Sequence, residues 1–231
     1  MPTFEAFCDL SDQAAPVRGY LHSAAKTGGN CLILAHGAGA NCQAPLLIAL
    51  ADAFASQSWM VLRCDLPFRQ LRPHGPPHRG SAEHDQAGLR AAVAAMRRLG
   101  PSQVALGGHS YGGRQASMLA AAEPELVESL LLLSYPLHPP KKPAELRTKH
   151  FPSLQTPALF VHGTRDGFAT IAEMQSALSL IPARTHLLPI AGAGHELLTK
   201  SNREALIEEI TSKFTTGFAT FSHDLPDAAA R

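Results

Sequence analysis

The sequence lacks an excess of charge of either sign. Its 231 residues carry 20 Lys and Arg against 19 Asp and Glu, a formal net charge of +1 with the histidines neutral. Proteins that bind nucleic acid or an anionic membrane surface rely on an excess of positive charge, so the sequence predicts neither partner. The hydrophobic fraction of 45% is ordinary for a globular domain, and the length suits one large domain better than two.

Long apolar runs and redox motifs are also missing. No stretch approaches the roughly 18 apolar residues that a membrane-spanning helix needs, and segment 1–9 has acidic residues where a signal peptide would carry basic ones. The four cysteines, Cys8, Cys31, Cys42 and Cys64, form no Cys-x-x-Cys pair. These absences favour a cytoplasmic protein with reduced thiols.

What the sequence does contain is an alternation of short apolar runs and helical segments. The runs predict parallel strands at 31–35, 60–64, 104–106, 128–134, 158–162 and 185–190, and the spacing predicts helices over 45–56, 81–99, 114–122 and 202–214. Strands that are apolar throughout are typical of a parallel sheet covered on both faces. Segments 3–9 and 17–23 predict an antiparallel hairpin. We therefore expect an α/β fold, a mostly parallel sheet with an antiparallel N-terminal edge and helices on both faces.

The domain is expected to cover residues 1–216, followed by a loosely held C-terminal tail over 217–231. No internal repeat of fixed period is visible. The proline-rich segments 74–79 and 137–143 are interpreted as loops inside the domain rather than as linkers.

Residues 108–112, Gly-His-Ser-Tyr-Gly, match the pattern Gly-x-Ser-x-Gly between a predicted buried strand and a predicted helix. A sharp strand-to-helix turn puts its central serine into a strained conformation that only glycine neighbours tolerate. This context indicates that Ser110 is a nucleophile, whereas a bare match to the pattern could equally be a glycine-rich packing turn.

A serine hydroxyl needs a base, and the base needs a group that orients it. His195 lies on a small-residue loop after the last predicted strand, at the sheet edge where sites form in parallel sheets. The loop after the fourth parallel strand has no carboxylate, whereas the loop after the fifth contains Asp166. The order Ser110, Asp166, His195 predicts a catalytic triad.

Acyl transfer also needs donors for the oxyanion of its tetrahedral intermediate. The segment His36-Gly37-Ala38-Gly39 follows the first parallel strand, and its glycines allow the Ala38 N–H to face the serine. With the Tyr111 N–H at the start of the helix, this predicts a two-donor oxyanion hole.

Together these motifs resemble those of α/β-hydrolases over about residues 30–215, with the resemblance carried by 34–39, 108–112, 162–166 and 192–195. A narrower resemblance, carried by 65–69, 112–114 and 134–138, is to small bacterial hydrolases related to dienelactone hydrolase and to the testis-expressed-thirty-like proteins. Dienelactone hydrolases use a cysteine nucleophile where this sequence has Ser110, so their substrate does not carry over. A eukaryotic relative is similar to a scaffold subunit, which leaves a catalytically silent interaction module as an alternative.

The expected activity is serine-dependent hydrolysis of a small or short-acyl ester. Only 23 residues, 135–157, separate the fourth and fifth parallel strands, where larger relatives insert a helical lid, so we expect an open site without a lid domain. The small-molecule ester is the expected partner. An acyltransferase or perhydrolase that uses the same acyl-enzyme is a further alternative.

Several polar residues have less certain roles. His36, Arg69 and His138 are candidates for contacting the substrate, and Arg114 is expected to pair with Asp65. We predict no cofactor, because the glycines of segment 37–42 form only a partial dinucleotide fingerprint. We predict no metal, because prolines and glycines interrupt the spacing of the loop histidines at 74, 78 and 84.

Overall fold

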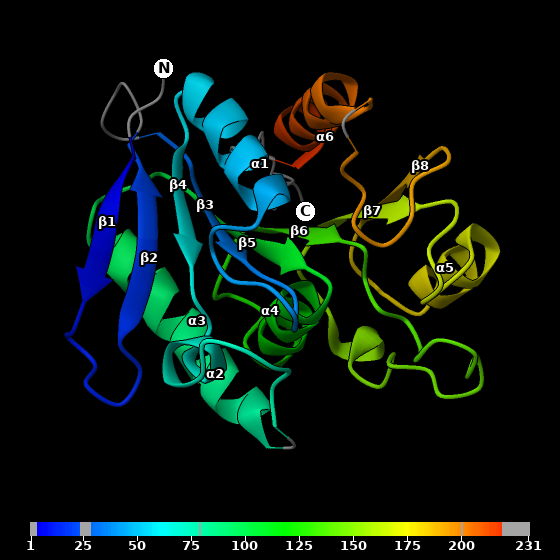
Figure 1. Cartoon of the computed structure of the whole chain (residues 1–231), viewed down its shortest axis with the longest axis horizontal. Helices are drawn as coiled ribbons and strands as arrows, with labels where there is room; N and C mark the ends of the chain where they lie inside the picture. Colours follow the sequence, from blue (N-terminus) through cyan, green and yellow to red (C-terminus); the bar gives the residue numbers. More distant parts are fainter. Residues whose placement is uncertain (1–3, 24–28, 79, 200, 219–231) are drawn as a thin grey trace, which may run out of the picture.

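Eight strands form one sheet in the order β1-β2-β4-β3-β5-β6-β7-β8 (Figure 1). The computed structural model describes residues 4–23, 29–78, 80–199 and 201–218. The strands are β1 (Phe4–Asp9), β2 (Val17–His22), β3 (Cys31–Ala35), β4 (Met60–Cys64), β5 (Val104–His109), β6 (Ser129–Leu133), β7 (Ala158–Gly163) and β8 (Thr185–Ile190). The six strands β4, β3, β5, β6, β7 and β8 pair in parallel with their neighbours. At the other edge β1 pairs antiparallel with β2, and β2 pairs antiparallel with β4. The expected architecture is confirmed.

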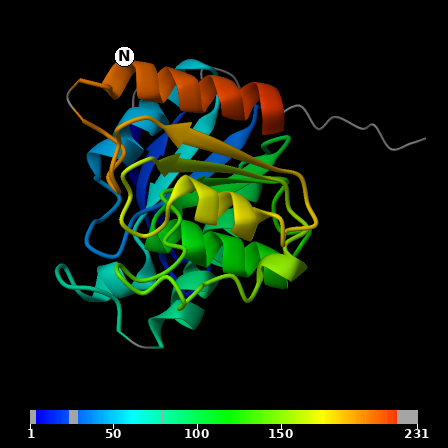
Figure 2. The same ribbon diagram turned by 90° about the vertical axis from the view of Figure 1, so that its right-hand side faces the viewer.

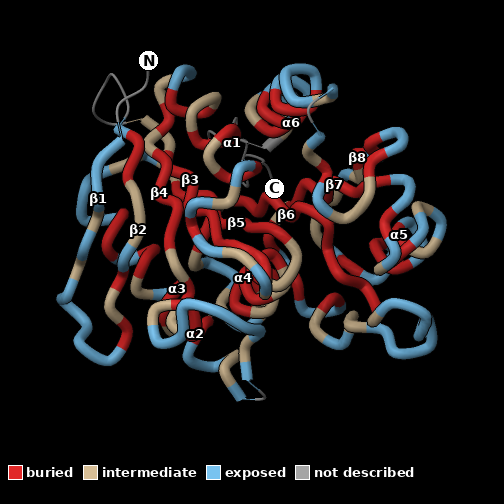
Figure 3. Tube along the Cα trace, in the orientation of Figure 1, coloured by how far each residue is buried: buried red, intermediate tan, exposed pale blue. Residues whose placement is uncertain are grey.

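Helices cover both faces of this sheet (Figure 2). They are α1 (Pro45–Ser56), α2 (Pro67–Leu71), α3 (Ser81–Arg97), α4 (Tyr111–Ala122), α5 (Ile171–Leu178) and α6 (Arg203–Phe218), with a 3₁₀ turn η1 (Phe151–Ser153). Side chains alternate between the faces of a strand, so Leu32 and Leu34 pack in the core under α1 and α6, whereas Ile33 and Ala35 pack in the core under α3 and α4. The central strands are buried throughout (Figure 3).

Three short elements were not expected from the sequence, namely α2, η1 and α5. The signal for α5 was present, because Thr170 and Glu173 form a capping box in which each side chain bonds the other's backbone. The expected helix at 114–122 begins at Tyr111, directly after the candidate nucleophile, and the last helix extends to Phe218. The expected tail therefore overlaps the end of α6, and residues 219–231 lie outside the described residues.

The antiparallel edge is held by a buried arginine. Arg63 on β4 is only 1% exposed, and its guanidinium carbon lies 5.4 and 5.1 Å from the ring centroids of Phe4 and Tyr20. Its Nε–H donates to His22 Nε2 over 2.8 Å, and its Nη1–H donates to the Cys42 carbonyl. Cation–π contacts and hydrogen bonds thus offset the cost of burying this charge.

No described helix combines the length and the apolar character needed to cross a membrane. All four cysteines are free thiols, and burial raises the pKa of the Cys31 and Cys42 thiols to about 12.

The His22 contact makes folding sensitive to acid. Burial and the adjacent Arg63 charge lower the pKa of His22 to about 4, whereas an unfolded chain protonates histidine near pH 6.5. Between these values the unfolded state binds more protons, so acid favours unfolding. We expect the free energy of unfolding, measured with urea, to fall as the pH drops from 6.5 to 4, with His22 contributing about 1–3 kcal/mol of that loss.

The variant His22→Gln should have a shallower pH dependence than the wild type over this range. The matched control is His84→Gln, which changes an exposed histidine. Equal slopes in the two variants would contradict the role assigned to His22.

Candidate active site

Ser110 sits at the junction of β5 and α4 in a strained backbone conformation, with φ 51° and ψ −112°. Glycines make this turn possible, because a Cβ added to Gly108 would lie 2.4 Å from the Ala35 carbonyl oxygen and one added to Gly112 would lie 2.6 Å from that of His36. The start of α4 therefore approaches the end of β3 more closely than any side chain allows. This close approach exposes the serine at the carboxyl edge of the sheet, as expected from the motif.

The three residues expected to form a triad are joined by hydrogen bonds. His195 Nε2 lies 2.8 Å from Ser110 Oγ, and His195 Nδ1 lies 2.9 Å from Asp166 Oδ2. The loops that carry the acid and the base are tied together, because the Arg165 N–H donates to the Ala193 carbonyl over 2.9 Å. The arrangement has the distances that a base needs to take a proton from a serine.

The Asp166 side chain is fully buried. Burial alone would raise its pKa, but hydrogen bonds from His195 and from the Phe168 N–H hold the pKa below the usual value for an aspartate. His162 Nε2, 3.7 Å from the carboxylate, donates instead to the Ala169 carbonyl. The carboxylate is thus kept ionised and aimed at His195.

Two residues that the sequence reasoning did not single out hold His195 in place. The His109 side chain donates from Nε2 to the His195 carbonyl over 2.8 Å, and the Phe168 ring lies against the imidazole with centroids 4.2 Å apart. His109 is the variable residue before Ser110 in the motif, so the motif contained it without indicating its role. Nothing in the sequence marks Phe168.

The loop expected to provide an oxyanion donor lies against the serine. A Cβ on Gly37 would lie 3.6 Å from Ser110 Cβ. The Gly37 carbonyl accepts hydrogen bonds from His36 Nδ1 over 2.8 Å and from the Ala40 N–H over 3.1 Å. In a trans peptide the carbonyl and the following N–H point in opposite directions, so these bonds also fix the direction of the Ala38 N–H.

His36 does not have the position expected of a substrate contact. It is fully buried, and its Nε2 accepts a hydrogen bond from the Leu66 N–H over 3.1 Å while Nδ1 donates to Gly37. Burial lowers the pKa of His36, in keeping with a neutral ring that uses one nitrogen as donor and the other as acceptor. The side chain holds the loop rather than facing a ligand.

Arg69 also differs from the expectation. The residue is 6% exposed. Its guanidinium donates to the carbonyls of Ala38, Ala40, Arg72 and Gly75 over 2.7 to 3.1 Å. These bonds consume the donors that a substrate carboxylate would need. Arg69 therefore ties the 38–40 loop to the segment after α2.

Tyr111, the second expected donor residue, is the first residue of α4, so its N–H lies outside the helical hydrogen-bond ladder. Its hydroxyl donates to Asp85 Oδ2 over 2.6 Å, while Asp85 Oδ1 accepts from the Phe68 N–H over 3.0 Å. Asp85, fully buried on α3, anchors the first turn of α4.

The other two sequence expectations need correction. His138 is turned toward α5, with Nδ1 donating to the Pro139 carbonyl and Nε2 3.6 Å from Glu173, and its side chain is 7% exposed. Asp65 accepts from the Cys42 N–H over 2.7 Å and lies 3.6 Å from His36, not beside Arg114. The described residues contain no group of three or more His, Cys, Asp or Glu side chains suited to a metal ion.

Comparison with known proteins identifies the family. A family model described as "Alpha/beta hydrolase domain" matches residues 28–223. The chain belongs to this family. A Haemophilus influenzae protein named "Putative esterase/lipase" is 37% identical over 84 residues, which are 36% of this chain and only 27% of that relative.

Solved structures share the α/β-hydrolase fold. A dienelactone hydrolase from Anabaena variabilis has a TM-score of 0.73 at 21% identity, covering 93% of this chain and 98% of its own. A serine hydrolase from Xanthomonas campestris described as having no lid has a TM-score of 0.69 at 18% identity, covering 93% and 96%. At these identities the likeness concerns the fold.

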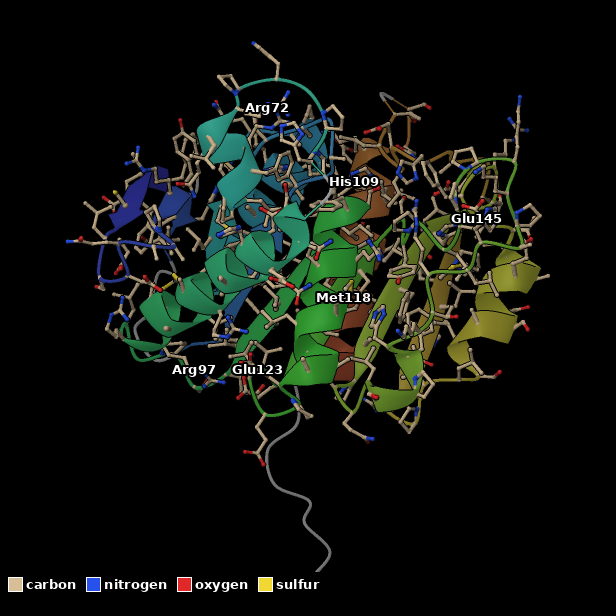
Figure 4. The ribbon with its side chains drawn as sticks, turned by 90° about the horizontal axis from the view of Figure 1, so that it is seen from below. Arg72, Arg97, His109, Met118, Glu123 and Glu145 are labelled. Carbon is tan, nitrogen blue, oxygen red and sulfur yellow. The ribbon has the colours of Figure 1, made fainter. Side chains whose placement is uncertain are left out.

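The role of Arg69 in this α/β-hydrolase can be tested by replacing its donors. Arg69→Met keeps the apolar stem but leaves four carbonyls without their donor, which should lower the free energy of unfolding by about 2–4 kcal/mol. Hydrogen exchange of the 37–40 amides should become faster. Arg72→Met is the control, because the Arg72 side chain bonds the exposed His78 and lies at the outer edge of the molecule (Figure 4). Equal exchange in both variants would contradict the assignment.

Proposed function

We propose that this α/β-hydrolase is a serine hydrolase that cleaves small or short-acyl carboxylic esters. The observation that carries the proposal is the hydrogen-bonded series Ser110, His195 and Asp166 on a strained strand-to-helix turn. A histidine within 2.8 Å of a serine hydroxyl, oriented by a buried carboxylate, is the arrangement that activates a serine as nucleophile.

In the first half of the reaction, His195 Nε2 takes the proton of Ser110 as Oγ attacks the ester carbonyl. The imidazolium that forms keeps its Nδ1–H bond to Asp166, whose lowered pKa keeps the compensating negative charge in place. The Ala38 and Tyr111 N–H groups donate to the oxyanion. His195 then returns the proton to the departing alcohol, and the acyl group stays on Ser110.

In the second half, a water molecule gives its proton to His195 and attacks the acyl carbonyl. The tetrahedral intermediate collapses, the acid leaves, and the proton returns to Ser110 Oγ. The same two N–H donors serve both intermediates, so the fixed direction of the Ala38 peptide matters in each.

The comparisons support hydrolysis as the general activity. The family match covers most of the chain. Relatives described as esterases include the partly matching Haemophilus protein and an esterase from Pyrococcus furiosus, with a TM-score of 0.75 at 14% identity. A cytoplasmic location, inferred from the sequence, stays a prediction.

The segment between β6 and β7 supports the preference for small substrates. Within this fully described stretch η1 is the only helix. The His138 N–H joins the segment to the body of the protein by donating to the Phe168 carbonyl, and the Tyr135 hydroxyl closes the segment on itself by donating to the Arg147 carbonyl. It therefore forms no helical lid of the kind that could enclose a long acyl chain.

Covalent labelling tests the nucleophile. We expect a fluorophosphonate probe to label the wild type, and Ser110→Ala to abolish labelling and to lower ester turnover about a million-fold. Ser102→Ala, which changes a serine far from the site in an exposed position, should behave as wild type. A wild type that is folded but neither labelled nor active would favour the silent interaction module, whereas labelling without hydrolysis would favour transfer to an acceptor other than water.

Acyl-chain preference tests the open site. With 4-nitrophenyl esters of two to sixteen carbons, we expect kcat/KM to be highest for the short acyl groups, because each further buried CH₂ adds binding energy only where the protein covers it. A maximum at twelve or more carbons would overturn the short-acyl assignment.

A further inference from the structure

Arg114 lies one helical turn after Ser110. Its N–H donates to the Ser110 carbonyl over 2.9 Å, and helical side chains lean toward the N-terminus of their helix, which here is the candidate active site. The side of α4 that carries Arg114 faces the 135–150 segment, because Ser117 Oγ, on the next turn of the helix, is bonded to His150 Nε2 over 2.9 Å. Figure 4 shows this segment, labelled at Glu145, beside α4.

A second arginine, Arg147, is fixed on the 135–150 segment that faces α4. The Arg147 backbone is held by the Tyr135 hydroxyl over 2.6 Å and by the Leu137 carbonyl over 2.8 Å, and its Nη1–H donates to the Pro136 carbonyl over 3.1 Å. Tyr135 follows β6, the neighbour of the strand that ends in the Ser110 turn. Arg147 is thus tied to the same edge of the sheet as the triad.

The positive charge here is not compensated by the protein. Burial first and the Arg114 charge second lower the pKa of Arg147, and the same two causes lower the pKa of His150 to about 4. In the described part of the chain no carboxylate lies within 4.0 Å of either guanidinium. Glu145, which attracts Arg147 from a distance, is paired with Lys142 at 2.9 Å.

Arg114 also has a buried donor without a partner. Its Nε is shielded from solvent and makes no hydrogen bond, although the guanidinium lies near the neutral Tyr135 hydroxyl. Buried donors are nearly always satisfied in folded proteins. Both arginines are nevertheless half-exposed as residues, so a small molecule can reach them.

We propose that Arg114 and Arg147 bind a carboxylate carried by the acyl part of the substrate, so that the enzyme prefers half-esters of dicarboxylic acids to neutral esters. The inference rests on the proposed ester hydrolysis and adds the substrate class. Two guanidinium groups offer planar pairs of donors that match the two oxygens of a carboxylate. A carboxylate bound there supplies the counter-ion that these two like charges lack among the described residues.

The test compares matched substrates that differ only in charge. Mono-4-nitrophenyl succinate, glutarate and adipate carry the carboxylate at increasing distance from the ester, and their methyl esters mask it. For the chain length that fits, we expect the wild type to have a kcat/KM about 10–100-fold higher for the half-ester than for its masked form. We expect most of the difference to lie in KM.

Arg114→Gln should lower kcat/KM for the half-ester about 10–100-fold and change that for the masked ester less than twofold. The masked ester reports folding and an intact triad in the same variant. Arg90→Gln is the matched control, because it also removes one positive charge, from an exposed ion pair with Glu123 on the outside of α3 and α4, and should leave the ratio unchanged.

The outcomes separate the two levels of inference. If the masked esters are hydrolysed in a Ser110-dependent way but the wild type prefers them at every length, or if Arg114→Gln slows both substrates equally, the carboxylate site is wrong and the hydrolase assignment stands. If neither substrate is turned over, the proposed function itself fails.

Discussion

The structure depends on the close approach of the first turn of α4 to the end of β3. Only glycine at 108 and 112 permits it, since a Cβ at either position would enter the space of the Ala35 or His36 carbonyl. The same approach forces Ser110 into a positive φ, places the Tyr111 N–H at the start of the helix, and brings the His36 loop within van der Waals distance of the serine. The positions of the proposed nucleophile and of both expected oxyanion donors are therefore consequences of one packing constraint.

Side chains that do not react hold this arrangement from several directions. His36 holds the peptide that carries the Ala38 N–H, and Arg69 holds the next peptide through the Ala38 carbonyl. Asp85 holds Tyr111, and His109 holds the backbone of His195. The bonds made by Arg69, Asp85 and His109 join segments that are distant in the chain. Rigid support of this kind keeps catalytic groups in place without reorganisation during the reaction. It also explains why buried polar residues gather at the carboxyl edge of an otherwise apolar sheet.

The arginines fall into two groups according to what their guanidinium groups bond. Arg69 donates its hydrogen bonds to backbone carbonyls, and Arg63 donates to His22 in the antiparallel edge of the sheet. Arg114 and Arg147, by contrast, have no acidic partner among the described residues, although the chain as a whole is almost neutral. Selection of a charged substrate at the proposed site is a local property that the net charge of +1 does not reveal.

The sequence by itself determined the strand order along the chain, the antiparallel edge and the grouping of Ser110, Asp166 and His195, because apolar periodicity and glycine-rich turns are local signals that survive in a single sequence. It misjudged His36, Arg69, His138 and the expected pair of Arg114 with Asp65. Only the tertiary structure decided these roles, because a polar side chain bonds whichever backbone or carboxylate group the fold brings near, and those partners come from segments up to 35 residues away in the chain.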